Sequence, residues 1–213
     1  MHMIGIIDYG MGNLRSVEKA LEHLQVPVSI ITSPKELSHC DGLILPGVGA
    51  FRDAIAELRR KDFVSPLLEV VASGKQLLGI CLGQQLLFER SYEDGEYEGL
   101  GLIAGEVVRF HPEPELKIPH MGWNAIEIVR PHALVNGVNS GDYVYFVHSY
   151  HVSPKDDDVI VATTQHGSQK FAAIVNQNNV TAAQFHPEKS QKVGLKMLQN
   201  FADSVLGTAS NSR

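Results

Sequence analysis

Cysteine is scarce in this sequence. The 213 residues include only Cys40 and Cys81, which cannot build a disulfide framework, and no CxxC pair is present to bind zinc. Long apolar runs are missing too: no stretch approaches the roughly 18 apolar residues that span a bilayer, and the chain opens without the basic start of a signal peptide. We therefore expect two free thiols in a cytoplasmic protein that does not enter a membrane.

Positive charge is also limited. The chain has 18 Lys and Arg against 24 Asp and Glu, for a net charge of −6. Nucleic acids bind a concentrated basic face, which these scattered cations do not supply, so we expect no nucleic-acid partner. The hydrophobic share of 44% and charged share of 20% are typical of a globular protein that folds around an apolar core.

Strand, turn and helix signals alternate over the first 90 residues. "MIGIID" (3–8) is an apolar run followed by a glycine-rich turn, and apolar residues then recur at helical spacing over 14–24. The run 28–32 predicts a second strand, and residues 33–36, "SPKE", have the form of a helix N-cap with a capping box. The alternation continues with a strand at 42–46, a helix through about 61, a helix near 64–72 and a strand at 76–80. This pattern predicts a parallel sheet buried between helices.

The pattern becomes β-rich from about residue 99. Polar turns separate the runs "LIAGEVVRF", "NAIEIV", "YVYFV", "VIVATTQ", "FAAIVN" and "VTAAQF". An amphipathic helix returns only near Val193. We expect a single α/β domain over residues 1–206, with a central, mixed, mostly parallel sheet flanked by helices and antiparallel strands enriched in the second half. The polar tail 207–213 is expected to fray.

Cys81 lies between two glycines in "GICLGQQLLF" (79–88), after a predicted strand and before a predicted amphipathic helix. G-x-C-x-G is the thiol version of the nucleophile elbow, in which Gly79 and Gly83 leave room for a strained turn. A helix N-terminus favours the thiolate and leaves the Leu82 backbone N–H to donate to an oxyanion. The alternative is that Cys81 is a small core residue at an ordinary turn.

A nucleophilic thiol needs a base, and the chain offers ten histidines. His186 ends the apolar run "VTAAQF" and precedes Pro187 and Glu188. Residues i and i+2 of an extended segment point to the same side, so Glu188 could bind one imidazole nitrogen while the other faces the thiol. Cys81, His186 and Glu188 would then be nucleophile, base and orienting acid. Taken alone, "HPE" is also typical of a surface turn.

A second glycine pair follows the strand that ends near residue 46. In "PGVGAF" (46–51) the permissive backbone of Gly47 and Gly49 can turn N–H groups towards a bound carbonyl, so Val48 or Gly49 would supply a second oxyanion donor. An ordinary turn between strand and helix is the alternative. His148 and His151 have a spacing that could bind metal, but no third ligand lies nearby in the sequence, so we expect neither a metal nor a cofactor.

"GICLGQQLLF" together with "FHPEKS" (185–190) resembles the class I (triad) glutamine amidotransferases, whose fold is flavodoxin-like. "DYGMGNLRSV" (8–17), "PHMGWN" (119–124) and "YFVHSYH" (145–151) are similar to one branch, the glutaminase subunits of imidazole glycerol phosphate synthases. The resemblance implies hydrolysis of L-glutamine to L-glutamate and ammonia through a γ-glutamyl thioester, in histidine biosynthesis. It gives Cys81, His186 and Glu188 the same triad roles as their spacing does.

The resemblance also implies further site residues. Around the glutamine they are Gly49, Leu82, Gln85, Glu93, Ser149 and Tyr150. Such enzymes pass ammonia to a cyclase subunit, a (β/α)8 barrel and the partner in a heterodimer, which forms imidazole glycerol phosphate and AICAR. The positions implied for that interface and the ammonia exit are Gly12, Asn13, His120, Met121, Gly122, Trp123, Tyr145 and Lys189. Trp123, the single tryptophan, could instead be buried core.

Three rival interpretations stay open. A nucleotide-binding protein is suggested by "GMGN" and "GVGA" after strands, but Arg15 and Arg52 take the place of the third glycine of G-x-G-x-x-G. A glutaminase of another pathway, or a γ-glutamyl peptidase, would keep the fold and change the substrate. A non-enzymatic interaction module would carry the triad only as a vestige.

Overall fold

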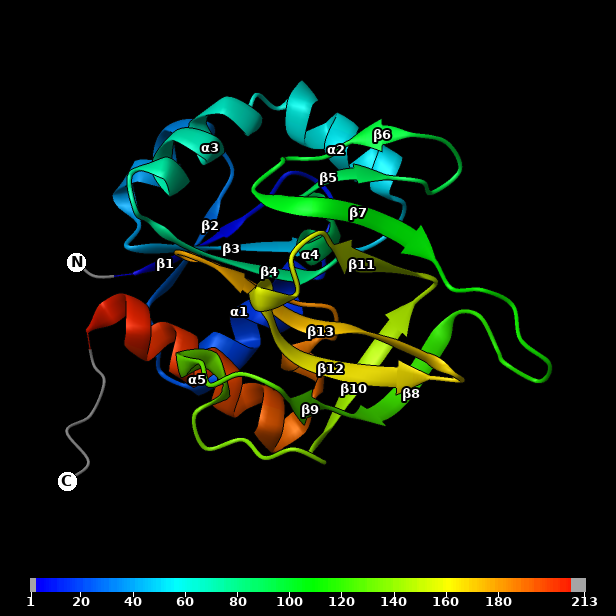
Figure 1. Cartoon of the computed structure of the whole chain (residues 1–213). Coiled ribbons are helices and arrows are strands. Elements are labelled where there is room, and N and C mark those ends of the chain that lie inside the picture. The colour runs from blue at the N-terminus through cyan, green and yellow to red at the C-terminus, as the bar shows by residue number, and fades with distance from the viewer. Residues whose placement is uncertain (1–2, 208–213) are drawn as a thin grey trace.

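The structure is a computed structural model that describes residues 3–207 (Figure 1). Its first half consists of β1 (Ile4–Ile7), α1 (Leu14–His23), β2 (Val28–Ile31), the 3-10 helix η1 (Pro34–His39), β3 (Gly42–Gly47), α2 (Phe51–Arg60), α3 (Val64–Ala72), β4 (Gln76–Cys81), α4 (Leu82–Leu86), β5 (Phe88–Ser91) and β6 (Tyr97–Glu98). The second half consists of β7 (Ile103–Arg109), β8 (His120–Ala125), β9 (Glu127–Ile128), η2 (Ala133–Val135), β10 (Tyr143–His148), β11 (Tyr150–Pro154), η3 (Asp157–Val159), β12 (Ile160–His166), β13 (Gln169–Gln177), β14 (Val180–Ala183), η4 (Pro187–Lys189) and α5 (Gln191–Leu206).

One eight-stranded sheet forms the centre of the molecule, in the order β2-β1-β3-β4-β14-β13-β12-β9. The pairings from β2 to β14 are parallel, and those from β14 to β9 are antiparallel. Figure 1 shows α2 and α3 on one face of this sheet and α1 and α5 on the other. The prediction of a single α/β domain on a mixed sheet, with antiparallel strands in the second half, is confirmed.

The central strands are apolar on both sides because both faces of the sheet are covered. Every residue of β1 is buried, and its successive side chains enter different cores: Ile6 packs with Val17 and Leu21 of α1, whereas Ile7 packs with residues of α2 and α3. Fully burying one such aliphatic side chain contributes about 1.5–3 kcal/mol. Because the side chains of β1 point alternately to the two faces of the sheet, this strand packs against both helical layers.

The strand order gathers three chain segments at one edge of the sheet. The parallel strands β3, β4 and β14 are neighbours, and their carboxyl ends are Gly47, Cys81 and Ala183. In open α/β sheets ligands bind outside these carboxyl ends. Because β4 lies between the other two, Cys81 is flanked by the loop after β3 and by the loop after β14.

Two smaller sheets lie beside the main one: β11-β7-β5-β6, which packs against the core that contains α2 and α3, and the antiparallel pair β10-β8. One local prediction is wrong. The amphipathic helix predicted after Cys81 is only the five-residue α4, because the chain pairs as β5 from Phe88 on. The N-cap predicted at "SPKE" is confirmed: Ser33 caps the 3-10 helix η1 and its capping box forms, with the Ser33 N–H donating to Glu36 at 2.9 Å.

The last described helix, α5, ends at Leu206, and Gly207 has the left-handed backbone (φ 68°) that commonly terminates helices. Residues 208–213, the remainder of the predicted tail, lie outside the described residues. No helix within residues 3–207 combines the length and the apolar character that crossing a membrane requires.

Candidate active site

Cys81 occupies a strained turn between β4 and α4. Its φ and ψ are 56° and −113°, a conformation with positive φ that costs a non-glycine residue about 1–3 kcal/mol. Strain of this kind persists only where the surrounding structure enforces it, and it is frequent at functional sites. The turn is the sharp strand-to-helix connection that the G-x-C-x-G pattern predicted.

The glycines around Cys81 are required by close backbone packing. A Cβ atom on Gly83 would lie 1.9 Å from the carbonyl oxygen of Leu45, and one on Gly79 would lie 2.9 Å from the carbonyl oxygen of Gly83. The first turn of α4 is therefore pressed directly against β3 and β4. Only glycine allows this approach, which confirms the predicted role of the two glycines in shaping the turn.

His186 and Glu188 form a buried pair beyond the end of β14. The Nδ1–H of His186 donates to Oε1 of Glu188 at 2.7 Å, and the side chains are 3% and 1% exposed. The i, i+2 relationship expected from the sequence therefore brings the carboxylate onto one imidazole nitrogen. A further side-chain hydrogen bond links His186 to Cys81, so the three side chains form one continuous chain.

The surroundings of His186 favour its protonated form. Burial alone would lower the pKa of the imidazole, but the hydrogen bonds with Cys81 and Glu188, and the negative charges on both, raise the pKa to about 9. A pKa this far above neutrality keeps the imidazolium populated at physiological pH. The arrangement can therefore supply a proton to a leaving group and take one back from water.

A cavity of about 280 Å³ opens at Cys81. Of the residues predicted from the sequence, it is lined by Val48, Gly49, Cys81, Leu82, Gln85, Glu93, Ser149, Tyr150 and His186. Three more residues line the cavity that were not expected there from the sequence, which are Pro119, Val147 and His148. All three belong to the quoted stretches "PHMGWN" and "YFVHSYH", and Val147 and His148 directly precede the expected site residues Ser149 and Tyr150.

Glu93 reaches this cavity from the loop between β5 and β6. Its Oε2 accepts from the backbone N–H of Phe51 at 2.7 Å, which fixes the carboxylate at the first turn of α2. Burial raises the pKa of this carboxyl. The loop has no motif of its own, so only its tertiary contacts, such as the bond to Phe51, show that it belongs to the site.

Tyr9 is a further residue next to the site, and the sequence did not predict its role. Its hydroxyl donates to the carbonyl oxygen of Pro46 at 2.9 Å, at the end of β3, and its side chain is fully buried. Burial, and secondarily the proximity of Cys81, raise the pKa of the phenol. Tyr9 therefore acts as a neutral donor that holds the start of the "PGVGAF" loop next to Cys81.

Of the residues expected to contact a partner subunit, some are exposed and one, His120, is buried. Met121 and Trp123 of β8 are 63% and 45% exposed, so the interpretation of Trp123 as buried core is wrong. The rings of Trp123 and Tyr145 meet edge to face, with centroids 6.1 Å apart. His120, in contrast, is only 5% exposed and lies behind this surface, where it cannot be a direct contact.

The remaining expected surface positions are accessible. Gly12, Asn13 and Gly122 are partly exposed, and Lys189 is exposed in η4. Strand β10 is bonded directly to the segment that carries His186, because the His186 N–H donates to the carbonyl oxygen of Tyr145 at 3.0 Å. The Tyr145 N–H in turn donates to the hydroxyl of Ser190 at 2.9 Å.

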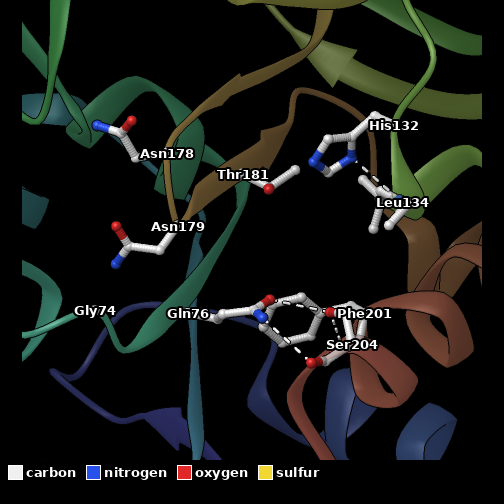
Figure 2. Close-up of a pocket in the computed structure, with 10 residues that line it drawn as sticks. Gly74, Gln76, His132, Leu134, Asn178, Asn179, Thr181, Phe201 and Ser204 are labelled. Atoms are coloured by element: carbon white, nitrogen blue, oxygen red, sulfur yellow. Dashed lines mark hydrogen bonds between the residues drawn. The ribbon is translucent and has the colours of Figure 1, made fainter. Parts of the chain in front are cut away.

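A second cavity, of about 340 Å³, lies at the amino-terminal ends of β4 and β14, on the other end of these strands from Cys81 (Figure 2). Figure 2 shows that Gln76 and Ser204 bond to each other on one side of it, while His132 accepts from the Leu134 N–H on another. None of the predicted site residues lines it. Within residues 3–207 no group of three or more His, Cys, Asp or Glu side chains is placed to hold a metal, and this includes His148 and His151.

Comparison with known proteins assigns the family. The profile of the family described as "Glutamine amidotransferase class-I" matches residues 5–205. The chain is 52% identical to imidazole glycerol phosphate synthase subunit HisH of Syntrophotalea carbinolica over 94% of this chain and 100% of the relative. It is 49% identical to the HisH subunit of Rhodopirellula baltica, over 97% and 100%.

Solved structures agree on the fold. A structure of PurLQS from Thermotoga maritima superposes with a TM-score of 0.76 at 21% identity, over 96% of this chain and 99% of that chain. A glutamine amidotransferase from the same organism gives a TM-score of 0.63 at 15% identity, over 98% and 86%. Together with the strained thiol turn and its buried histidine-glutamate pair, these matches show that the chain belongs to the class I glutamine amidotransferases, and among them to the HisH subunits of imidazole glycerol phosphate synthase.

Proposed function

We propose that this chain hydrolyses L-glutamine with Cys81 as nucleophile, His186 as general base and acid, and Glu188 as the group that orients His186. The observation that carries the proposal is the hydrogen-bonded chain of these three side chains at the head of a strained turn. Cys81, at the N-cap of α4, and His186 both line the cavity, so the nucleophile and the base open onto the same space.

The reaction proceeds in two halves. The Cys81 thiolate attacks the side-chain amide carbon of glutamine, and the negative charge moves to the amide oxygen, where the Leu82 N–H and an N–H from Val48 or Gly49 stabilise it. The His186 imidazolium protonates the departing nitrogen, the C–N bond breaks, and ammonia leaves a γ-glutamyl thioester. His186 then accepts a proton from water as the water attacks the thioester, which releases glutamate and restores the thiolate.

The cavity has the size and polarity for one glutamine. We assign recognition of the substrate to Gln85, Glu93, Ser149 and Tyr150 because all four line the cavity around Cys81. The carboxylate of Glu93 is the group suited to an α-ammonium, since it is held rigidly by the Phe51 N–H. Ser149 and Leu82 are proposed to act through their backbone.

The ammonia is proposed to pass to a cyclase subunit, a (β/α)8 barrel, in a heterodimer. Met121, Trp123 and Tyr143 expose large apolar side chains on the paired strands β8 and β10, as expected of an interface core. Gly12 and Asn13 would lie at its margin, with Tyr145 and Lys189 near the ammonia exit. The complex would form imidazole glycerol phosphate and AICAR in the cytoplasm; the name of the HisH relatives, a subunit of imidazole glycerol phosphate synthase, supports the first of these products.

Glutamate formation should be measured for the chain alone and with candidate cyclase subunits. The isolated chain is expected to be slow and to accelerate when the cyclase and its ligand bind. Alkylation of Cys81 by a glutamine-mimicking chloroketone, read by mass spectrometry, should inactivate the complex. A Cys81 that stays inert in the assembled complex would overturn the enzyme assignment in favour of an interaction module.

A further inference from the structure

A chain of hydrogen bonds runs from β8 to α4 along the wall of the cavity. The Nδ2 of Asn124 lies 3.2 Å from Nε2 of His120, and Nδ1 of His120 lies 3.2 Å from Nε2 of His148. The Nδ1 of His148 lies 2.8 Å from the carbonyl oxygen of Tyr150. That same oxygen accepts from Nε2 of Gln85 at 2.9 Å. The chain thus ends on a residue that lines the cavity.

The two histidines of this chain are buried cross-strand partners. His120 on β8 pairs directly with His148 on β10, and the side chains are 5% and 7% exposed. Burial lowers the pKa of both imidazoles, that of His120 to about 4. Both rings are therefore neutral at physiological pH, and each has one donor and one acceptor nitrogen.

The direction of every hydrogen bond follows from one fixed acceptor. A carbonyl oxygen can only accept, so Nδ1 of His148 carries the proton and its Nε2 must accept. His120 consequently donates through Nδ1, and its Nε2 accepts from the amide of Asn124. Buried polar groups need partners, so reversing any one bond would leave a donor facing a donor.

Gln85 is held from two sides. Besides the Tyr150 carbonyl, its Nε2 donates to Oε1 of Gln184 at 3.0 Å, so both amide hydrogens are used. Gln184 is fully buried, and its own Nε2 has no partner within the described chain. Such an isolated amide is costly to bury. Neither bond of Gln85 uses its Oε1, which is left as the acceptor that this side chain can offer to a ligand.

We propose that His148 and Gln184 are positioning residues that lock the amide of Gln85 with its Oε1 as an acceptor for an N–H group of the substrate. The inference rests on the proposed glutaminase function. His120 and Asn124 extend the same support to β8, the strand that exposes Met121 and Trp123. The strand proposed to face the partner and the substrate-binding amide thus share one network.

Loss of either support should act on substrate recognition more than on chemistry. When Gln184 no longer accepts, or when His148 no longer holds the Tyr150 carbonyl in place, the Gln85 amide can rotate by half a turn and present hydrogens where the substrate also presents hydrogens. The loss of one neutral hydrogen bond corresponds to roughly a tenfold change in affinity. Because Cys81 and His186 are not members of the network, kcat should change by less than about threefold.

His148 gives the first test, in the full chain assembled with the cyclase subunit. His148→Leu removes the donor to Tyr150, whereas His148→Asn keeps an N–H close to the place of Nδ1. We expect the first variant to raise the KM for glutamine about tenfold and the second to restore it to within about threefold. A purely structural role would give equal defects in both, and that result would overturn the proposal.

Gln184, which follows β14 directly, gives a test that is independent of His148 on β10. Gln184→Met removes the acceptor at similar length and should raise KM about tenfold, while Gln184→Glu keeps an acceptor oxygen and should stay closer to wild type. In a Gln85→Ala background neither His148→Leu nor Gln184→Met should raise KM further, because they act through the same amide. Additive effects in these double variants would contradict the inference.

Two controls separate this inference from its basis. His132→Asn alters a histidine beside the far cavity (Figure 2) and should leave KM unchanged. The rate of Cys81 alkylation by iodoacetamide, which needs no glutamine site, should be unaltered in all variants that keep the wild-type Tm. If the wild-type complex hydrolyses no glutamine, the proposed function fails; if it does and KM is insensitive to His148→Leu and Gln184→Met, only the inference fails.

Discussion

Nδ1 of His186 donates to Oε1 of Glu188 at 2.7 Å inside the protein, with both side chains almost fully buried. This bond fixes the imidazole ring so that its other nitrogen is directed to Cys81. The carboxylate is held two residues along the same segment, at the end of β14, and needs no third element to reach the ring. One chain segment therefore positions both groups of the pair with respect to the thiol.

The first prediction concerns the unequal roles in this pair. His186→Ala removes both proton donor and acceptor and should lower kcat for glutamine hydrolysis by at least about 10³-fold. Glu188→Gln keeps an oxygen that can accept from Nδ1–H, so the loss should be about 10- to 100-fold. Steady-state glutamate formation in the complex measures both. Equal losses would contradict the assignment of Glu188 as an orienting group.

The second prediction concerns pH. The folded protein raises the pKa of His186 to about 9, so the charged imidazole is favoured by the fold, and this contribution is lost as the pH rises through that value. Because the imidazolium protonates the leaving nitrogen, kcat/KM should fall above about pH 9. Glu188→Gln removes a negative charge beside the ring and should move this alkaline limb to lower pH. If kcat/KM of the wild type and of Glu188→Gln decreases at the same alkaline pH, His186 is not the group that causes the decrease.

The third prediction concerns the turn that carries Cys81. Gly83→Ala places a methyl group 1.9 Å from the Leu45 carbonyl oxygen, which is backbone and cannot move aside cheaply. We expect a loss of more than about 3 kcal/mol in the free energy of unfolding, or failure to fold. Gly74→Ala is the matched control: a Cβ there meets no atom within 4 Å, so only the backbone strain of its positive φ, about 1 kcal/mol, applies. Urea denaturation distinguishes them, and similar losses would refute the packing explanation.

The fourth prediction concerns the exposed aromatic surface. Trp123→Ala should weaken binding to the cyclase subunit at least tenfold, as expected of a central interface aromatic residue. Because Trp123 is 45% exposed in the single chain, the Tm of that chain should change by less than a few degrees. Val129→Ala, at a residue that is 49% exposed beyond β9, serves as the control and should leave the affinity unchanged. Calorimetric titration of the cyclase measures both, and unchanged affinity in Trp123→Ala would place the interface elsewhere.

The sequence by itself determined the local elements. Apolar runs of four to six residues became the strands β1, β3 and β4 because a sheet covered on both faces needs continuous apolar strands. The glycines around Cys81 indicated a turn that only glycine can form, and the two-residue spacing of His186 and Glu188 placed both on one side of an extended segment. These features depend on neighbours in the chain, which the sequence displays directly.

Only the tertiary structure decided which distant segments meet. The pairing of β14 with β4 brings His186 to a thiol 105 positions earlier, and an apolar pattern does not specify strand order. Glu93 reaches the cavity from a polar loop, and Tyr9, His148 and Gln184 form hydrogen bonds to Pro46, His120 and Gln85, which lie 37, 28 and 99 positions away in the sequence. Periodicity reports which face of an element is buried but not what covers it, so the partners of these polar groups emerge only when the sheet is assembled.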